Sequence, residues 1–389
     1  MKYIVTVDVG TMSLKTSVYD IKGFSLFESV KEYSAIYLPE GLVEQNPNDW
    51  KDALQYTLYG VGEFIRNRQI EITAVTVTSQ RASVIPVDEK GIPLYNAITW
   101  QDKRSQKTTS KLLEKISLKE IYLKTGLRAN PYFSLPKMIW IKENLSDIYA
   151  KTFKFLGVQD YVIYLLTKQF KTDVSQAART MLMDITNFRW SSKMLEISGI
   201  DEDKLCELLP PGGIAGNLTY EFKALLGLRE DVPVIIAGGD QQNAALALNI
   251  LAEGKAEANT GTGSFVIAYS DKPVFDENAR VLCSAAAIPG KWIVEAGVFN
   301  TGSIYRWFRN EFFSSFGGNY DLMNKEIAES PIGANGVMLI PHFEGSAAPY
   351  WNPFAKGLFF NLSLGTKRGD MSRAIFEGIV MEIDRKSVV

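Results

Sequence analysis

Residues 3–19 read YIVTVDVGTMSLKTSVY and carry the pattern from which the fold can be inferred. Two β-rich stretches, 3–7 and 14–19, flank the loop residues 8–13, DVGTMS. Stretches that are dense in β-branched side chains and bounded by Gly or Asp predict two strands joined by a turn. We expect Asp8 at the end of the first strand, in a cleft, because the interior of a buried strand rarely carries a carboxylate.

The same pattern returns in the second half of the chain. Residues 256–269, AEANTGTGSFVIAY, again read strand, Gly-Thr turn, strand. Residues 9–13 and 260–264 both match xGTxS. A five-residue match has a high chance rate, but its position at the start of each half favours a duplicated α/β domain with a linker near 249–255.

Helices and strands alternate between these two turns, as they do in α/β domains. The apolar spacing predicts helices over residues 50–68, 104–116, 134–145, 158–166 and 190–197. Further strands are expected over 24–30, 72–78, 83–87 and 232–237, and a further helix through 244–248.

The composition excludes several classes of protein. The length of 389 residues predicts two or three domains. The formal net charge of -2 gives no broad attraction to nucleic acid or to an anionic membrane. Asp8 interrupts the N-terminal apolar stretch, unlike a secretory signal, and no uncharged apolar run is long enough to span a bilayer. We expect a cytoplasmic protein without nucleic-acid or membrane partners.

Histidine and cysteine are too scarce for many kinds of site. His342 is the single histidine, and Cys206 and Cys283 are the two cysteines. These counts exclude His-cluster metal sites and a disulfide framework, and leave little room for a Ser-His-Asp triad. Acid–base chemistry must therefore rest mainly on carboxylates, Lys or Tyr.

The two Gly-Thr turns are candidate anion sites. Such a turn presents backbone N–H groups and hydroxyls to an anion, and Lys15, just beyond the first turn, adds a positive charge. One turn of this kind is more often a plain hairpin, but two opposing turns suit a polyphosphate. Asp8 either orients Mg²⁺ beside a phosphate or caps the turn. Asp240 either caps a helix or accepts a proton from a substrate hydroxyl, and the sequence leaves both open.

A second group of residues is suited to polyol recognition. Aromatic rings pack on the CH faces of a polyol, and planar polar groups bind its hydroxyls. The residues of these types that follow predicted strands or Pro-bounded stretches are Gln80, Arg81, Trp100, Asp102, Arg104 and Tyr132. Taken singly, each is more often a core or surface residue.

Over residues 2 to about 383 the chain resembles the FGGY carbohydrate kinases, within the actin/hexokinase/heat-shock ATPase superfamily. The resemblance rests on several long motifs in the right order: residues 8–15, 44–50, 132–144, 239–242, 259–263, 348–357 and 373–378. It implies duplicated actin/hexokinase-like (ribonuclease H-like) α/β domains with a cleft between them. The first would span 1–248, and the second, incomplete, 249–389.

The resemblance also implies an activity: transfer of the γ-phosphoryl group of ATP to a hydroxyl of a sugar or polyol, with Mg²⁺. A homodimer is an additional expectation. Asp240 would be the general base, and Asp8 and Asp240 would position the metal. The residues implied to contact nucleotide are Thr11, Ser13, Lys15, Thr262, Gly263, Gly302 and Arg306. Those implied to contact the acceptor are Gln80, Arg81, Trp100, Tyr132, Asp240 and Gln241.

Two departures from the family matter. The segments around residues 80, 100, 132 and 240 look most like glycerol kinases, but Ala82 stands where those enzymes have Glu. The missing carboxylate leaves both glycerol and a ketose such as xylulose open as the acceptor.

The family also continues beyond the end of this chain, so we expect a truncated product that binds ATP poorly and aggregates readily. The alternatives are a catalytically weak remnant that binds sugar, and a chaperone- or actin-like ATPase, against which Arg81, Trp100 and Tyr132 argue.

Overall fold

The computed structural model describes residues 2–68 and 70–387, which form two compact units. Unit 1 comprises the described residues up to Ala247 together with Cys283–Trp292. Unit 2 comprises Leu248–Leu282 and the described residues from Ile293 onward. Among the helices of the described ranges, none has both the length and the apolar character needed to cross a membrane.

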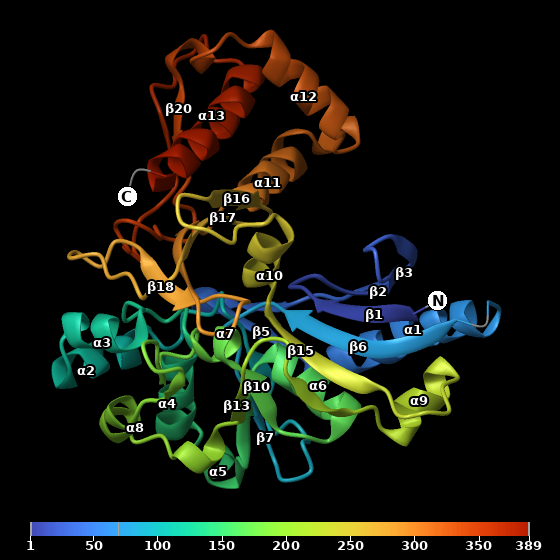
Figure 1. The fold of residues 1–389 in the computed structure, drawn as a ribbon. Coiled ribbons are helices and arrows are strands. Elements are labelled where there is room, and N and C mark those ends of the chain that lie inside the picture. The colour runs from blue at the N-terminus through green and yellow to red at the C-terminus, as the bar shows by residue number, and fades with distance from the viewer. Residues whose placement is uncertain (1, 69, 388–389) are drawn as a thin grey trace. The chain divides into compact units, whose positions relative to one another are not determined.

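Unit 1 is built on a six-stranded sheet with the order β14-β15-β6-β1-β2-β3 (Figure 1). Its strands are β1 (Lys2–Val9), β2 (Ser13–Asp20), β3 (Ser25–Glu32), β6 (Glu71–Ser79), β14 (Ile214–Asn217) and β15 (Pro233–Gly239). Strand β6 is parallel to both β1 and β15, and its last residue, Ser79, pairs with Val9 and with Gly239. The residues that follow these three strands therefore lie along one edge of the sheet.

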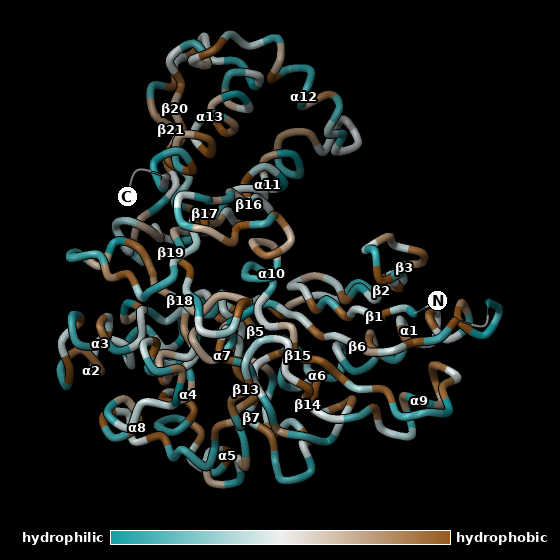
Figure 2. Tube along the Cα trace, in the orientation of Figure 1, coloured by the Kyte–Doolittle hydropathy of each residue, from teal (hydrophilic) through white to brown (hydrophobic). Residues whose placement is uncertain are grey.

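Helices cover the face of the sheet on which alternate residues of β1 and β6 are buried valines, which share a core with α1 and α6. Helix α1 (Pro47–Arg66) packs against β2 and β3, and α6 (Val158–Thr167) packs against β6, β14 and β15. Helix α1 begins where the side chain of Asn46 accepts a hydrogen bond from the backbone N–H of Asn48, with Pro47 in the first turn. The apolar residues of β1, β6 and α6 can be located by their brown colour in Figure 2.

The other elements of unit 1 form small sheets and helices around this core. The small sheets are β4 (Ile36–Leu38) with β5 (Leu42–Gln45) and β8 (Ala97–Ile98), β7 (Ile85–Val87) with β9 (Lys154–Leu156), β10 (Lys171–Asp173) with β13 (Glu207–Leu209), and β11 (Met183–Asp184) with β12 (Arg189–Trp190). The helices are α2 (Gln106–Lys115), α3 (Leu118–Thr125), α4 (Ser134–Asn144), α5 (Ser146–Lys151), α7 (Val174–Ala177), α8 (Ser192–Ser198), α9 (Tyr220–Leu226) and α10 (Asp240–Ala247), with 3-10 turns at Pro39–Gly41 and Glu202–Lys204.

Unit 2 begins with the second strand-turn-strand pattern. Its elements are β16 (Ala256–Thr260), β17 (Ser264–Ser270), β19 (Trp292–Val298), β20 (Met338–Ile340), β21 (Leu358–Phe360), α11 (Gly302–Phe312), α12 (Tyr320–Glu329) and α13 (Arg368–Ser387), with 3-10 turns at Ser314–Phe316 and Ala334–Gly336. Strand β18 (Leu282–Ala285) belongs to unit 1 from Cys283 onward. The sheet order is β16-β17-β19-β18, and β20 pairs with β21. Phe308, Phe313, Met323 and Ile375 are fully buried in the core beneath α13.

The strand and helix predictions are largely confirmed. The expected strands at 3–7, 14–19 and 72–78 lie within β1, β2 and β6, and the expected helix at 50–68 is α1. The boundaries differ from the predicted ones by a few residues, as in α2, which starts at Gln106 rather than 104. Short elements such as β4 and β5 gave no clear periodicity and were not predicted.

The packing of α1 against α9 yields a stability prediction. A Cβ placed on Gly62 would lie 2.2 Å from the backbone oxygen of Leu225, whereas one on Gly60 would meet mainly the Ser29 hydroxyl at 3.1 Å. Gly62→Ala should therefore lower the free energy of unfolding by about 1–3 kcal/mol through overpacking. Gly60→Ala, in the same helix, should be neutral or stabilise by up to about 1 kcal/mol through helix propensity. Urea unfolding monitored by circular dichroism compares the two, and equal midpoints would contradict the packing described.

Candidate active site

The acidic and basic side chains of the site lie where β1, β6 and β15 end. Asp8 is near the end of β1, Gln80 and Arg81 follow β6, and Asp240 follows β15. Parallel pairing places the carboxyl ends of these strands at one edge, which is the usual location of ligands in such sheets. The fold thus brings together residues that are up to 232 positions apart, from 8 to 240.

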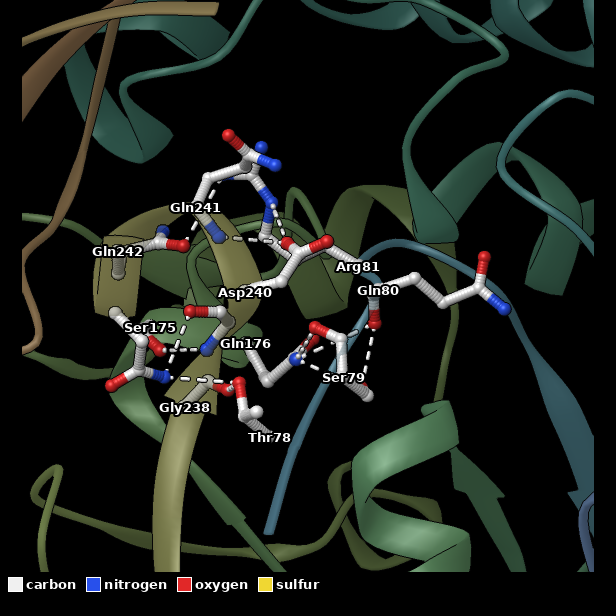
Figure 3. A network of polar contacts seen from close by, with 12 residues as sticks. Thr78, Ser79, Gln80, Arg81, Ser175, Gln176, Gly238, Asp240, Gln241 and Gln242 are labelled. Carbon is white, nitrogen blue, oxygen red and sulfur yellow. Dashed lines mark hydrogen bonds and ion pairs between the residues drawn. The ribbon is translucent and has the colours of Figure 1, made fainter. Parts of the chain in front are cut away.

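Asp240 is held between a basic side chain and the backbone (Figure 3). The Nε of Arg81 lies 3.5 Å from its Oδ1, and the same oxygen accepts a hydrogen bond from the N–H of Gln241 at 2.8 Å. Arg81 is almost fully buried, and 34% of the Asp240 side chain is exposed. Nη1 of Arg81 donates to Oε1 of Gln242 at 3.3 Å. Arg81 and the Gln241 backbone thus orient a carboxylate that is partly exposed.

Asp8 and Asp240 influence each other electrostatically. Burial raises the pKa of the Asp8 carboxyl above its usual value, and the negative charge of Asp240 raises this pKa further. Lys15, which is opposite Asp8 in the β1–β2 register, acts in the other direction and lowers it. Within residues 2–68 and 70–387 no cluster of three or more His, Cys, Asp or Glu could hold a metal by itself. A cation between these two carboxylates would take its other ligands from phosphate oxygens and water.

An aromatic wall stands beside the first turn. The Trp100 and Tyr132 rings are 5.6 Å apart and meet edge to face. Nε1 of Trp100 lies 3.4 Å from the Thr11 hydroxyl, which in turn donates to Oε1 of Gln80 at 3.1 Å. The structure thus joins Gln80, Trp100 and Tyr132, and places Thr11, expected on the nucleotide side, in contact with this group.

Two supporting groups were not identified from the sequence. The ammonium group of Lys137, fully buried, donates to the backbone oxygens of Pro131, Tyr132 and Phe133 at 2.6–3.0 Å and so holds the Tyr132 loop. Asp102 and Arg104, which had been considered for polyol binding, pair with each other at 2.8 Å, and Arg104 also pairs with Glu44. These two residues support the loop that carries Trp100.

The remaining candidates in unit 1 lie in the first turn, in β2 and in α10. The backbone oxygen of Ser13 accepts from the N–H of Gly10 at 2.9 Å and closes the turn. Lys15 is half-exposed, and its Nζ lies 3.9 Å from Oε1 of Glu28. Gln241, the second residue of α10, is shown beside Asp240 in Figure 3.

In unit 2 the second turn is joined to the start of α11. The N–H groups of Gly302 and Ser303 donate to the backbone oxygens of Gly261 and Thr262 at 3.0 and 3.2 Å. A Cβ on Gly302 would lie 2.3 Å from the Gly261 oxygen, and one on Gly263 would lie 2.7 Å from the Val298 oxygen. Both positions therefore require glycine. Arg306 is exposed one helical turn after Gly302.

A small cavity lies behind residue 82. It measures about 30 Å³, enough for a water molecule, and its lining includes Ala82, Ser83, Asp160, Gln176 and Cys206. Burial raises the pKa of Asp160 to about 7, and its Oδ2 accepts a hydrogen bond from the N–H of Gly157 at 2.7 Å. Cys206 and Cys283 are both buried and unpaired with each other.

Comparison with known proteins identifies the family. The N-terminal domain of the FGGY family of carbohydrate kinases matches residues 3–247, and the C-terminal domain of that family matches residues 256–386. The chain therefore belongs to the FGGY family of carbohydrate kinases, which are phosphotransferases that act on alcohol groups with ATP as the phosphate donor.

Curated relatives include two kinds of kinase. A gluconokinase of Bacillus subtilis (strain 168) is 30% identical over 98% of this chain and 75% of its own length. A glycerol kinase of Thermococcus onnurineus (strain NA1) is 33% identical over 97% of this chain and 76% of its own length. A gluconate kinase and a ligand-bound xylulose kinase, both from Lactobacillus acidophilus, have similar solved structures. Each has a TM-score of 0.87 and 26% sequence identity to this chain, and each match covers 98% of this chain. The match covers 77% of the gluconate kinase chain and 76% of the xylulose kinase chain.

These findings confirm the predicted α/β fold class with the architecture of the actin-like ATPases. They do not support the expectation of a truncated, weakly active remnant. The match to the C-terminal domain of the family extends as far as residue 386.

The buried carboxyl of Asp160 yields a pH prediction. Its pKa of about 7 in the folded protein exceeds the unfolded value of about 4, so the folded state binds the extra proton between these values. The free energy of unfolding should therefore fall as the pH rises from about 4 to 7. Asp160→Asn, which mimics the protonated form, should remove this slope and stabilise the protein at pH 8 by roughly 1–3 kcal/mol.

Asp201→Asn, an exposed carboxylate in the same unit, serves as the control and should leave the slope unchanged. Urea unfolding from pH 4.5 to 8 gives the slopes. An identical slope in Asp160→Asn and in the unaltered protein would show that Asp160 is ionised when folded.

Proposed function

We propose that this protein is an ATP-dependent sugar or polyol kinase in which Asp240 accepts the proton of the acceptor hydroxyl. The observation that carries the proposal is the placement of Asp240 directly after β15, where the buried Arg81 orients a carboxylate that is partly exposed. A helix cap alone needs no buried guanidinium beside it. A carboxylate held in a fixed orientation suits a general base, which must lie within hydrogen-bond reach of the proton it takes.

The proposed nucleotide contacts are assigned within each unit. In unit 1 they are Thr11 of the first turn with Ser13 and Lys15 of β2, and in unit 2 they are Thr262 and Gly263 of the second turn with Gly302 and Arg306 of α11. The close backbone approach at Gly263 and Gly302 supports this assignment, because it holds the second Gly-Thr turn, a kind of turn that can bind anions through its backbone, against the start of α11.

We further propose that Asp8 and Asp240 hold Mg²⁺. Support comes from their mutual repulsion, which raises the pKa of Asp8 and which a cation would relieve. When bound, Mg²⁺ neutralises charge on the transferring phosphoryl group. Lys15 and Arg81 flank the two carboxylates and would attract phosphate to the same edge of the sheet.

The proposed acceptor site is formed by Gln80, Arg81, Trp100, Tyr132 and Gln241. In the described part of the chain, Nε2 of Gln80 and Nε2 of Gln242 are buried and have no hydrogen-bond partner. A buried amide donor without a partner costs about 1–3 kcal/mol, so a ligand hydroxyl that accepts from it stabilises the complex. Several hydroxyls on a short carbon chain fit such donors beside an aromatic wall.

The acceptor is proposed to be larger than glycerol. Ala82 is buried beside the cavity and has no acceptor group for a hydroxyl, and a gluconokinase and a xylulose kinase are among the similar proteins. We place the enzyme in the cytoplasm, where ATP is available and where Cys206 and Cys283, which form no disulfide with each other, stay reduced. A homodimer stays a prediction.

The role of Asp240 predicts the effect of Asp240→Asn. Asn keeps the size of the side chain and caps a helix well, so the melting temperature should change little, while kcat should fall by roughly 10²–10⁴. A coupled ADP-release assay with glycerol, xylulose and gluconate measures kcat. Asp231→Asn, which removes a surface ion pair with Lys223, is the control and should keep full activity. Near-normal turnover in Asp240→Asn would exclude Asp240 as the base.

The proposed acceptor preference predicts how substitutions of Ala82 change the selectivity between glycerol and xylulose. Ala82→Glu should raise the ratio of kcat/KM for glycerol over that for xylulose by about 10-fold, because a new carboxylate accepts from glycerol hydroxyls. Ala82→Gln has nearly the same size without the charge and should shift the ratio less. An unchanged ratio in Ala82→Glu would show that residue 82 does not select the acceptor.

A further inference from the structure

The end of β15 leaves the sheet just before Asp240. The β15–β6 register shifts between Ile236 and Gly238, and Gly238 has φ of +101°. At this irregularity, side-chain oxygens accept hydrogen bonds from the backbone N–H groups of β15. The N–H of Gly238 donates to Oε1 of Gln159 at 2.8 Å, and the N–H of Gly239 donates to the Ser175 hydroxyl at 2.9 Å. Side chains therefore hold the backbone N–H groups of the two residues that directly precede Asp240.

Gln159, through its side chain, and Ser175, through its backbone N–H, both donate to one buried carboxylate, that of Asp173. Its Oδ1 accepts from Nε2 of Gln159 at 3.1 Å, and its Oδ2 accepts from the N–H of Ser175 at 2.8 Å. Asp173 also caps α7, the short helix that carries Ser175 and Gln176. It is completely buried. The segment before Asp240 is thus anchored in the interior of unit 1.

The same short helix holds the segment that carries Arg81. Nε2 of Gln176 donates to the backbone oxygen and to the hydroxyl of Ser79, each at 3.2 Å (Figure 3). Ser79 directly precedes Gln80 and Arg81. Adjacent residues of α7 therefore contact the end of β6 and the end of β15.

The fit around Gly238 is too close to be incidental. A Cβ at this position would lie 2.4 Å from the Ser175 hydroxyl and 3.1 Å from Oδ2 of Asp173. On the other side of the strand, the Thr78 hydroxyl donates to the Gly238 oxygen at 2.7 Å. The backbone before Asp240 is held on both sides.

We infer that α7 is a positioning clamp for the reaction, in which Ser175 fixes the segment of Asp240 and Gln176 fixes the segment of Gln80 and Arg81. None of these clamp residues is proposed to touch a substrate. The inference rests on the proposed function, in which Asp240 is the base. A shift of about 1 Å in a reacting group costs on the order of 10² in rate, so a loosened clamp acts on kcat through Asp240.

The test is a double-mutant cycle between Ser175→Ala and Asp240→Asn. Ser175→Ala should lower kcat by about 10- to 100-fold and change the acceptor KM by less than about 3-fold. In the Asp240→Asn background the same change should lower kcat by less than about 2-fold, because the group it positions is already lost. Glycerol, xylulose and gluconate, each with ATP, are the acceptors used. An equal fold-loss in both backgrounds would show that Ser175 does not act through Asp240.

A buried serine elsewhere in unit 1 provides the matched control. The Ser191 side chain caps α8 by accepting from the N–H of Met194 at 3.3 Å. Ser191→Ala should lower the melting temperature as Ser175→Ala does, while leaving kcat unchanged. A similar loss of kcat in both variants would mean that general destabilisation, rather than positioning, causes the effect.

Backbone amide exchange tests the clamp independently of activity. Hydrogen–deuterium exchange followed by mass spectrometry should become faster in Ser175→Ala for the peptide covering residues 238–241, and stay unchanged there in Ser191→Ala. If the unaltered protein phosphorylates none of the three acceptors, the proposed function fails, and the exchange result still decides the clamp. Unchanged exchange at 238–241 in Ser175→Ala would overturn it.

Discussion

The parallel pairing of β6 with both β1 and β15 is the constraint on which the site depends. It brings the ends of three strands to one edge of the sheet, so that Asp8, Arg81 and Asp240 meet although they are far apart in sequence. Burial raises the pKa of the Asp8 carboxyl above its usual value, and the negative charge of Asp240 raises this pKa further. A sheet slipped by one residue would turn these side chains to the opposite face.

Local pattern was enough to predict most of unit 1. The β-branched stretches at 3–7 and 72–78 and the Gly-Gly-Asp segment after 232–237 each end in polar residues, and the rule for parallel strands places such ends together. The duplication of the Gly-Thr turn predicted the second α/β unit. Aromatic residues at 100 and 132 were grouped on chemical grounds, and the two rings do contact each other.

The supporting residues could not be predicted, because their roles depend on burial and on distant partners. Lys137 looks like an ordinary helix residue in the sequence, yet it binds three backbone oxygens of the Tyr132 loop. Asp173 reads as a simple helix cap, and only the fold shows that it also anchors Gln159. Arg104 was considered for ligand binding because its type suits hydroxyls, but Asp102 and Glu44 already occupy its guanidinium group.

The central claim is that the phosphoryl group passes from ATP to a hydroxyl of a small polyol or sugar bound beside Asp240. The most direct measurement is ³¹P NMR of the products formed from ATP and each acceptor, glycerol, xylulose and gluconate. We expect a phosphomonoester of at least one acceptor, formed in equal amount to ADP. Release of inorganic phosphate at a rate independent of the acceptor, with no phosphomonoester, would contradict the account and indicate an ATPase.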